Sequence, residues 1–514
     1  MIRSYLPFML IVVSFQFALA QKPLNYCGTL SGRSEWLQKF QANGKPVEKD
    51  PEEILYVPIS IHMLGTNSGA GPFSLDRLFN IICTLNSDFE AANIHFYLKG
   101  DVHYINRTSW YKHDCIRTGA RMMFAGNIPN TINNYFVDDP AGNCGYNLPY
   151  AGIAVAYSCA KPTDHTWAHE VGHQLSLPHP FLGWEGGITH DNTQPPRFTN
   201  PAPEKVTYDY TEFKDSFLLF KDTLVIDTAW VERADGSNCR FAADGFCDTE
   251  PDYIAYRWNC DPDSISFVTQ TDPAGVKFKS EGRWIMSYSA DNCQKGFSSE
   301  QIAAMRANIR EEKPWLLGQD APLNAISVPE APKSIYPKFG EIIPFDRAAL
   351  SWEAVPNATH YLVQVSRFSS YSILSYSEVV AGTEIDLPEL LNGRAYYWRI
   401  RPYNAFDFCQ GWYDMGSFLA GVVTSVDRPE NGAVFRVYPN VTKPGMEVSF
   451  TTEDEIYHSN TLIWWDMTGR KAAVTSLQPN SRILQVPDYL ASGMYRLQLM
   501  NGKKSSFSSI LIAP

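Results

Sequence analysis

Three histidines and one glutamate lie close together between residues 169 and 179. His169 and His173 are four residues apart, so on a helix they share one face and can bind the same metal ion. Zinc binds imidazole nitrogens at about 2.0–2.1 Å, and a catalytic zinc keeps one position open for water. Glu170 follows the first histidine directly, where it can take a proton from that water as a general base. The pattern favours a hydrolytic zinc site.

His179, six residues beyond His173, is the predicted third ligand. It cannot share the helical face, because Pro178 ends any continuing helix and the chain must turn before it. Ser176 stands in that turn, where a left-handed backbone would cost a serine about 1–2 kcal/mol. A surface helix that carries histidines by chance is the simpler alternative, and the third histidine disfavours it. His179 also disfavours peptidases whose third zinc ligand is a distant glutamate.

The run from His169 to His179 resembles the zinc signature of the metzincin peptidases, with Ser176 where the family usually has glycine. The segment Arg283–Ser289 resembles their Met-turn, in which a methionine lies beneath the zinc site. The resemblance implies that Met286 is that methionine and that Tyr288 hydrogen-bonds the oxyanion of the tetrahedral intermediate. An ordinary turn in a protein core is the alternative for this segment taken alone.

Within the metzincins, residues 50–315 resemble the pappalysin family. The likeness is carried by His169–Phe181, Asp248–Pro251 (with Glu250 inserted), Phe297–Arg306, Leu85–Phe89 and Ile94–Phe96. It implies an α/β (α+β) catalytic domain over residues 50–318, with a mixed sheet and a zinc helix. Ser298 and Gln301 predict a capping box at a helix start. Structural Ca²⁺ is also implied, with Asp244–Asp252 as a candidate loop, although such carboxylates are more often solvated.

An extended peptide substrate is expected to pair with an edge strand through its backbone. The apolar run Ala151–Ala156, just before the predicted zinc helix, is the candidate for that strand.

Cys27 lies in the run Asn25–Thr29, which resembles the Cys-Gly-Thr of bacterial pappalysin propeptides. The resemblance implies that residues 21–49 form a propeptide-like segment whose thiolate fills the open zinc position and keeps the protein latent. Pairing of Cys27 with another cysteine is the alternative. An activating cut is expected between Gly28 and Glu52, with Lys39, Lys45 and Lys49 as candidate points.

Ten cysteines predict disulfide bonds and an oxidising compartment. Eight of them lie between Cys83 and Cys293 and could form four bridges within the catalytic region, with 105 possible connectivities. Residues 1–20 read as a secretory signal peptide, with Arg3 before an apolar run and a small-residue cleavage site. No later run is long and apolar enough to span a membrane. A formal charge of −12 argues against nucleic-acid binding.

Two all-β sandwich domains are predicted to follow a proline-rich linker at residues 319–345. Residues 346–420 resemble a fibronectin type III module, with Trp352 as its buried strand tryptophan. Residues 430–514 resemble the C-terminal sorting domain of type IX secretion in Bacteroidetes. The matching runs are Val437–Asn440, Asp466–Arg470 and Ala491–Leu497. Another β-sandwich without an address function is the alternative.

These expectations describe a multidomain, secreted or cell-surface zinc endopeptidase that is made latent. Its expected partners are a protein or peptide substrate and the type IX secretion machinery. The competing hypothesis is a surface adhesin whose zinc site is structural or inactive, and Glu170 argues against it because a metal holder does not need that carboxylate. Substrate preference and oligomeric state do not follow from the sequence.

Overall fold

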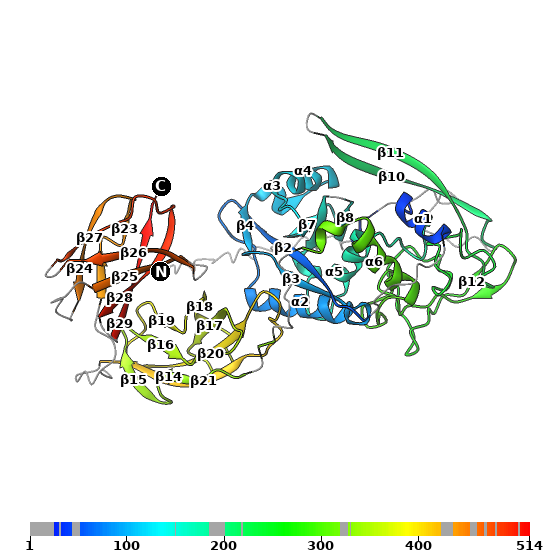
Figure 1. Cartoon of the computed structure of the whole chain (residues 1–514). Helices are drawn as coiled ribbons and strands as arrows, with labels where there is room; N and C mark the ends of the chain where they lie inside the picture. The colour runs from blue at the N-terminus through cyan, green and yellow to red at the C-terminus, as the bar shows by residue number, and fades with distance from the viewer. Residues whose placement is uncertain are drawn as a thin grey trace, which may run out of the picture. The chain divides into compact units, whose positions relative to one another are not determined.

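The computed structural model divides the chain into two compact units, Met1–Leu323 and Asn324–Pro514. Both are rich in β-sheet (Figure 1), so the predicted multidomain, sheet-rich architecture is confirmed. The predicted signal peptide lies outside the described residues. The residues that the structure describes are 25–29, 32–43, 52–149, 151–184, 201–216, 219–318, 327–328, 330–422, 435–452, 460–466, 470–478, 481–501 and 504–513.

The first unit is built around a mixed sheet in the order β1-β8-β9-β6-β2-β3, with β4 also paired to β2. Strands β3, β2, β6 and β9 run parallel, whereas β8 runs antiparallel to β9. The strands β2, β6 and β9 are buried almost throughout, as strands covered on both faces are. The bounds are β1 Asn25–Cys27, β2 Leu55–Gly65, β3 Ile94–Leu98, β4 His103–Asn106, β6 Ile132–Val137, β8 Asn143–Leu148 and β9 Gly152–Ala156.

Six helices of the described part of this unit accompany the sheet (Figure 1). Ser298 and Gln301 form the predicted capping box at the start of α6, which confirms that prediction. Helix α5 is buried at all nine of its residues, so it lies inside the unit rather than on its surface. The bounds are α1 Glu35–Ala42, α2 Leu75–Asp88, α3 Thr108–Tyr111, α4 Ile116–Gly126, α5 Thr166–Gln174 and α6 Ser299–Glu311.

Shorter pieces complete the first unit. Strands β10 and β11 form a long antiparallel hairpin that extends away from the sheet (Figure 1). Their bounds and those of the remaining elements are β5 Lys112–His113, β7 Asp139–Pro140, β10 Lys205–Ser216, β11 Leu219–Trp230, β12 Gln270–Thr271, β13 Lys277–Phe278, and the 3₁₀ turns η1 Glu90–Ala92, η2 Tyr157–Cys159 and η3 Pro314–Leu316.

Disulfide bonds join Cys144 to Cys159, Cys239 to Cys247 and Cys260 to Cys293. Cys27 and Cys115 are free, and Cys115 is exposed. The prediction of four bridges among the eight cysteines from Cys83 to Cys293 is therefore wrong. Cys115 lies at the surface, directly before helix α4. Sequence spacing alone cannot show that no other free thiol lies close to it. The bridges agree with an oxidising compartment.

The second unit begins with a sandwich of a three-stranded sheet, β14-β16-β19, and a five-stranded sheet, β15-β21-β20-β17-β18. Trp352 and Trp398 fill its core, with ring centroids 6.3 Å apart. This strand order agrees with the expected fibronectin type III-like sandwich. The bounds are β14 Ser334–Tyr336, β15 Glu341–Pro344, β16 Ala349–Trp352, β17 His360–Ser366, β18 Leu374–Val380, β19 Glu384–Asp386, β20 Arg394–Tyr403 and β21 Tyr413–Gly421.

The linker differs from the prediction. Residues 319–345 were expected to connect two domains, but β14 and β15 lie inside that range and pair with β16 and β21 of the sandwich. Both are edge strands of their sheets, where proline is tolerated because it need not donate to a ladder. The proline-rich composition therefore marks sheet edges here as well as a connection.

The last part of the chain repeats the same strand order in a second sandwich. Its sheets are β22-β24-β27 and β23-β29-β28-β25-β26, and β23 pairs in parallel with β29 as β15 does with β21. Trp464 and Leu497 are fully buried in its core. Residues 467–469 of the Asp466–Arg470 motif lie outside the described residues. The bounds are β22 Phe435–Tyr438, β23 Val441–Thr442, β24 Glu447–Thr452, β25 Asn460–Asp466, β26 Lys471–Leu477, β27 Ile483–Gln485, β28 Gly493–Asn501 and β29 Lys504–Ile512.

Across the described part of the chain, no helix combines the length and the apolar character that crossing a bilayer requires.

Candidate metal centre

The three predicted ligands meet in the interior of the first unit. The Nε2 atoms of His169 and His173 lie 3.1 Å apart, and that of His179 lies 3.1 Å and 3.0 Å from them. Ligand nitrogens at about 2.0–2.1 Å from a tetrahedral zinc would be separated by roughly 3.3 Å. The three nitrogens are therefore spaced as ligands of one ion.

Backbone carbonyls orient two of these imidazoles. His169 Nδ1 lies 2.7 Å from the oxygen of Ile285, and His173 Nδ1 lies 2.8 Å from the oxygen of Leu177. A carbonyl can only accept, so each Nδ1 carries the proton and each Nε2 presents a lone pair to the centre of the group. Burial lowers the pKa of all three histidines, that of His179 to about 3. Neutral imidazoles are the form that binds metal.

The turn between helix α5 and His179 has the left-handed backbone that the sequence placed there. Ser176 has φ of 73°, and its hydroxyl accepts a hydrogen bond of 3.0 Å from the Asn308 side chain on α6. That contact holds the serine in a conformation that glycine would adopt more readily. The chain then reaches His179 through Leu177, whose carbonyl also holds His173.

Cys27 completes the group. Its sulfur lies 3.7 Å from His173 Nε2, and the ligand atoms of Cys27 and the three histidines all lie within 4.8 Å of one another. Cys27 ends strand β1, which pairs in parallel with β8, and the Gly28 N–H donates to the oxygen of Gly145. Burial and the nearby Glu170 carboxylate raise the pKa of the free Cys27 thiol well above its usual range.

Glu170 lies beside this group with its side chain fully buried. Burial raises the pKa of its carboxyl to about 8, against the opposing effect of hydrogen bonds from Cys27 and Thr29. The Thr29 hydroxyl donates to Glu170 Oε2 over 2.9 Å and accepts from the Asn147 N–H over 2.7 Å. The carboxylate that was predicted as general base is thus bound by the segment that carries Cys27.

Segment 283–289, which was predicted to be a Met-turn, packs against helix α5. Met286 is fully buried, and its sulfur stands where any side chain at Gly172 would have to go. The residue before Met286, Ile285, has the backbone carbonyl that accepts the hydrogen bond from His169 Nδ1. The segment thus supports the ligand helix by packing and by one hydrogen bond.

Tyr288 lies on the other side of the histidines. Its ring centroid is 5.0 Å from that of His179, and its hydroxyl donates to the carbonyl of Cys27 over 3.3 Å. The Tyr288 hydroxyl therefore points at the Cys27 backbone, and the carbonyl of a peptide bound in that place could accept the same hydrogen bond.

The edge strand was assigned to the wrong residues. Ala151–Ala156 contains β9, which is flanked on both sides by β8 and β6 and has no free edge for a peptide. The strand next to β1 is β8, Asn143–Leu148. The sequence did not separate them because both strands are short, and the polar β8 (Asn-Cys-Gly-Tyr-Asn-Leu) lacks the apolar run that marks a buried strand.

The acidic loop Asp244–Asp252 was the candidate for structural Ca²⁺. Asp244 accepts hydrogen bonds from the Phe246 N–H and the Thr249 hydroxyl, and Asp252 accepts from Ser280 and Ser287. These two carboxylates thus bind protein donors, and the calcium site stays a prediction. Among the residues described, the one group of metal-type side chains is Cys27 with the three histidines.

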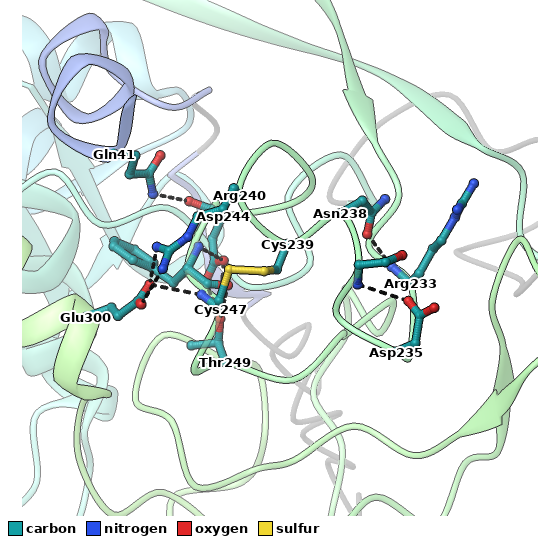
Figure 2. The surroundings of a disulfide bond; sticks show 12 residues. Gln41, Arg233, Asp235, Asn238, Cys239, Arg240, Asp244, Cys247, Thr249 and Glu300 are labelled. Carbon is teal, nitrogen blue, oxygen red and sulfur yellow. Dashed lines mark hydrogen bonds and ion pairs between the residues drawn. A yellow bond between two sulfur atoms is a disulfide. The ribbon is translucent and has the colours of Figure 1, made fainter. Parts of the chain in front are cut away.

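A second region of the N-terminal segment docks on the loop that the Cys239–Cys247 disulfide closes (Figure 2). The Gln41 side chain donates to the oxygen of Asp244 over 2.8 Å. Arg33 donates to the oxygens of Arg240 and Phe241 over 3.4 Å and 3.0 Å. Segment 25–43 therefore contacts the unit at the metal group and again at this loop.

The donor set fits zinc. Three neutral imidazoles and one cysteine sulfur, all buried, are a ligand combination that zinc accepts. Calcium prefers oxygen ligands and does not fit this set. The ion itself is not identified by the geometry, since other transition metals accept the same ligands.

Three residues at the site escaped the sequence reasoning. Thr29 was only part of a motif, and Asn147 and Gly145 lie in a strand that was not recognised. An ideal Cβ at Gly145 would lie 2.8 Å from Glu170 Cγ, so this strand can approach the glutamate only because it has a glycine there. A signal was available only for Thr29, two residues after Cys27.

No family model matches the chain, and no characterised protein matches it in sequence. Solved structures match part of it. Fibronectin(III)-like modules of Clostridium thermocellum CbhA share 12% identity over 35% of this chain and 93% of theirs, with a TM-score of 0.15. The FN1–FN3 domains of chicken CNTN1 share 10% identity over 36% of this chain and 68% of theirs, with a TM-score of 0.15. These TM-scores are too low to support an argument, so each sandwich fold is assigned from its own strand order.

Proposed function

We propose that the first unit is a metzincin-like zinc endopeptidase of the pappalysin type, held in a latent form by its N-terminal segment. The observation that carries the proposal is the convergence of His169, His173 and His179 with Cys27 beside a buried Glu170. When bound by the three histidines, zinc would supply a Lewis acid that polarises the scissile carbonyl and acidifies water.

The chain's own residues have separate roles in this proposal. Glu170 takes a proton from the attacking water and passes it to the leaving amine. The Tyr288 hydroxyl donates to the oxyanion, in the place where it now meets the Cys27 carbonyl. Strand β8 binds the substrate backbone along the edge that β1 occupies. The substrate class is therefore an extended peptide, and its side-chain preference stays open.

Latency follows from the position of segment 25–29. Cys27 would supply a fourth ligand to a metal held by the three histidines and so exclude water, and β1 fills the edge that a substrate needs. Activation requires removal of this segment. Of the candidate cut points, Lys39 lies within helix α1 with its side chain exposed, and Lys45 and Lys49 lie outside the described residues.

A structural zinc site is the second candidate, and one observation favours it. Three histidines and one cysteine form a closed set of four ligands, as structural zinc sites have. In that case the metal stabilises the fold, Cys27 is a permanent ligand, and the chain binds partners through its sandwiches as an adhesin.

The test is peptide hydrolysis by the full chain with a specific protease sequence placed in residues 44–51. Cutting followed by removal of the N-terminal fragment should release hydrolysis of a mixed peptide library, with one zinc retained per chain. Glu170→Gln should keep the zinc and lose the hydrolysis. Retained zinc with no hydrolysis by the parent, once residues 25–43 are shown to have left, would support the structural site instead.

We further propose that the chain is exported by its signal peptide and the type IX machinery, as residues 430–514 suggest by resemblance. The disulfide bonds support an extracellular destination. Deletion of residues 430–514 in a type IX-competent host should leave the protein in the periplasm. Unchanged appearance in the medium would argue that this sandwich has no address function.

A further inference from the structure

We propose that Thr29 forms a second lock on the site, one that acts on Glu170 and does not depend on the metal. The inference rests on the proposed latent peptidase and concerns how its latency is maintained. Cys27 also hydrogen-bonds Glu170, and the Thr29 hydroxyl adds a partner that is not a metal ligand. In this chain the same short segment binds both groups.

The contacts of Thr29 are well defined. Its hydroxyl has one proton to donate and lone pairs that accept, and it donates to Glu170 Oε2 and accepts from the Asn147 N–H. Thr29 is 3% exposed and Glu170 is fully buried, so water does not compete for these hydrogen bonds. The Thr29 hydroxyl therefore links Glu170 to strand β8 through two hydrogen bonds.

The neighbouring residues fix Thr29 in this place. Gly28 donates to Gly145, and an ideal Cβ at Gly28 would lie 2.6 Å from the Asn143 side-chain nitrogen. Gly145 in turn lets the segment and Glu170 approach closely, since a side chain there would meet the glutamate. The fit requires both glycines and places the Thr29 hydroxyl between Glu170 and β8.

This arrangement blocks the reaction in two ways. The Thr29 hydroxyl occupies Glu170 Oε2, one of the two carboxyl oxygens to which a water to be deprotonated could donate. It also uses the Asn147 N–H, a donor on the strand that is proposed to bind substrate. The Thr29 N–H donates to the Cys27 sulfur over 3.2 Å, but the two partners of the Thr29 hydroxyl, Glu170 and Asn147, are not metal ligands, so the lock persists when the sulfur–metal contact is lost.

The experiment uses the full chain with the protease sequence in residues 44–51, in parent and Cys27→Ala backgrounds. After cutting, the N-terminal fragment should stay bound to the Cys27→Ala protein and inhibit it. Adding Thr29→Val, which keeps the shape and removes the hydroxyl, should weaken inhibition by about tenfold, as loss of a buried hydrogen bond does. Thr29→Ser, which keeps the hydroxyl, should behave like the parent.

Fragment retention is also measured by native mass spectrometry on zinc-depleted protein, where no hydrolysis is needed. Thr29→Val should release the fragment faster than Thr29→Ser in this assay too. Equal release by the two variants, with and without zinc, would overturn the second lock. Absence of hydrolysis in every variant, with the expected difference in retention, would leave the lock standing and refute the peptidase.

Discussion

The sulfur of Cys27 lies 3.7 Å from His173 Nε2, across 146 residues of sequence. The contact joins the N-terminal segment to the helix that carries two of the three predicted metal ligands. Both side chains are buried, so the contact belongs to the interior of the first unit.

Replacement of Cys27 by alanine should partly relieve latency. The change removes the fourth ligand and leaves β1 and Thr29 in place, so peptide hydrolysis by the uncut chain should rise by about tenfold rather than to the fully activated rate. Cys115→Ser is the matched control, because Cys115 is also free but exposed. If the uncut Cys27→Ala chain hydrolysed peptides no faster than the Cys115→Ser control, Cys27 would not contribute to latency.

Replacement of His179 by alanine should abolish stoichiometric zinc binding by the cut chain from which residues 25–43 have left, measured by metal analysis after dialysis. Cys27 leaves with that fragment, so only two histidines on one helix would remain, and two nitrogens bind zinc too weakly to retain it. Full retention would indicate a different third ligand.

A change of Ser176 tests the turn that delivers His179. Ser176→Ala keeps the φ of 73° and loses the hydrogen bond from Asn308, so it should lower the free energy of unfolding by about 1 kcal/mol. Ser176→Gly loses the same hydrogen bond but relieves the backbone, and should be more stable than Ser176→Ala. An alanine variant as stable as the glycine variant would contradict this account of the turn.

Gly145→Ala should reduce hydrolysis by the activated chain by about a hundredfold. The added methyl group would push against Glu170, and a displacement of about 1 Å at a catalytic group costs roughly that factor. Gly318→Ala is the control, since a Cβ there meets nothing within 4 Å. Equal rates for the two variants would show that Glu170 tolerates the contact.

The pH dependence of stability should carry a contribution from Asp244. Burial raises the pKa of its carboxyl to about 7 in the folded protein, above its ordinary value of 3.8. The folded state therefore prefers the protonated form, and this stability is lost as the pH rises from about 4 to 7. Asp244→Asn should flatten that part of the profile in thermal unfolding, and an unchanged slope would contradict the assignment.

The sequence predicted the side chains of the site better than the backbone around them. The spacing of His169, His173 and His179 follows helical geometry and a turn, both of which are local. The neighbours of a strand are a tertiary relationship: β8 lies between β9 and β1, β1 comes from far away in the sequence, and no local pattern expresses that pairing. For the same reason the role of Thr29 appeared only when Glu170 was placed beside it.

The sandwiches show the same limit. Alternation around Trp352 predicted strands, and the buried tryptophan was located correctly. Prolines in residues 319–345 suggested a connection, although β14 and β15 use that stretch as sheet edges. The proline content of a segment does not show which strands it pairs with, and that pairing is what makes β14 and β15 edge strands.

The most direct test of a zinc site closed by Cys27 is zinc-edge X-ray absorption on the full chain, before and after the cut in residues 44–51 and removal of the fragment. The account predicts one sulfur at about 2.3 Å with nitrogens at about 2.0–2.1 Å before the cut, and a light atom in place of the sulfur after it. A spectrum without sulfur before the cut, or a sulfur that persists after the fragment has left, would contradict the account.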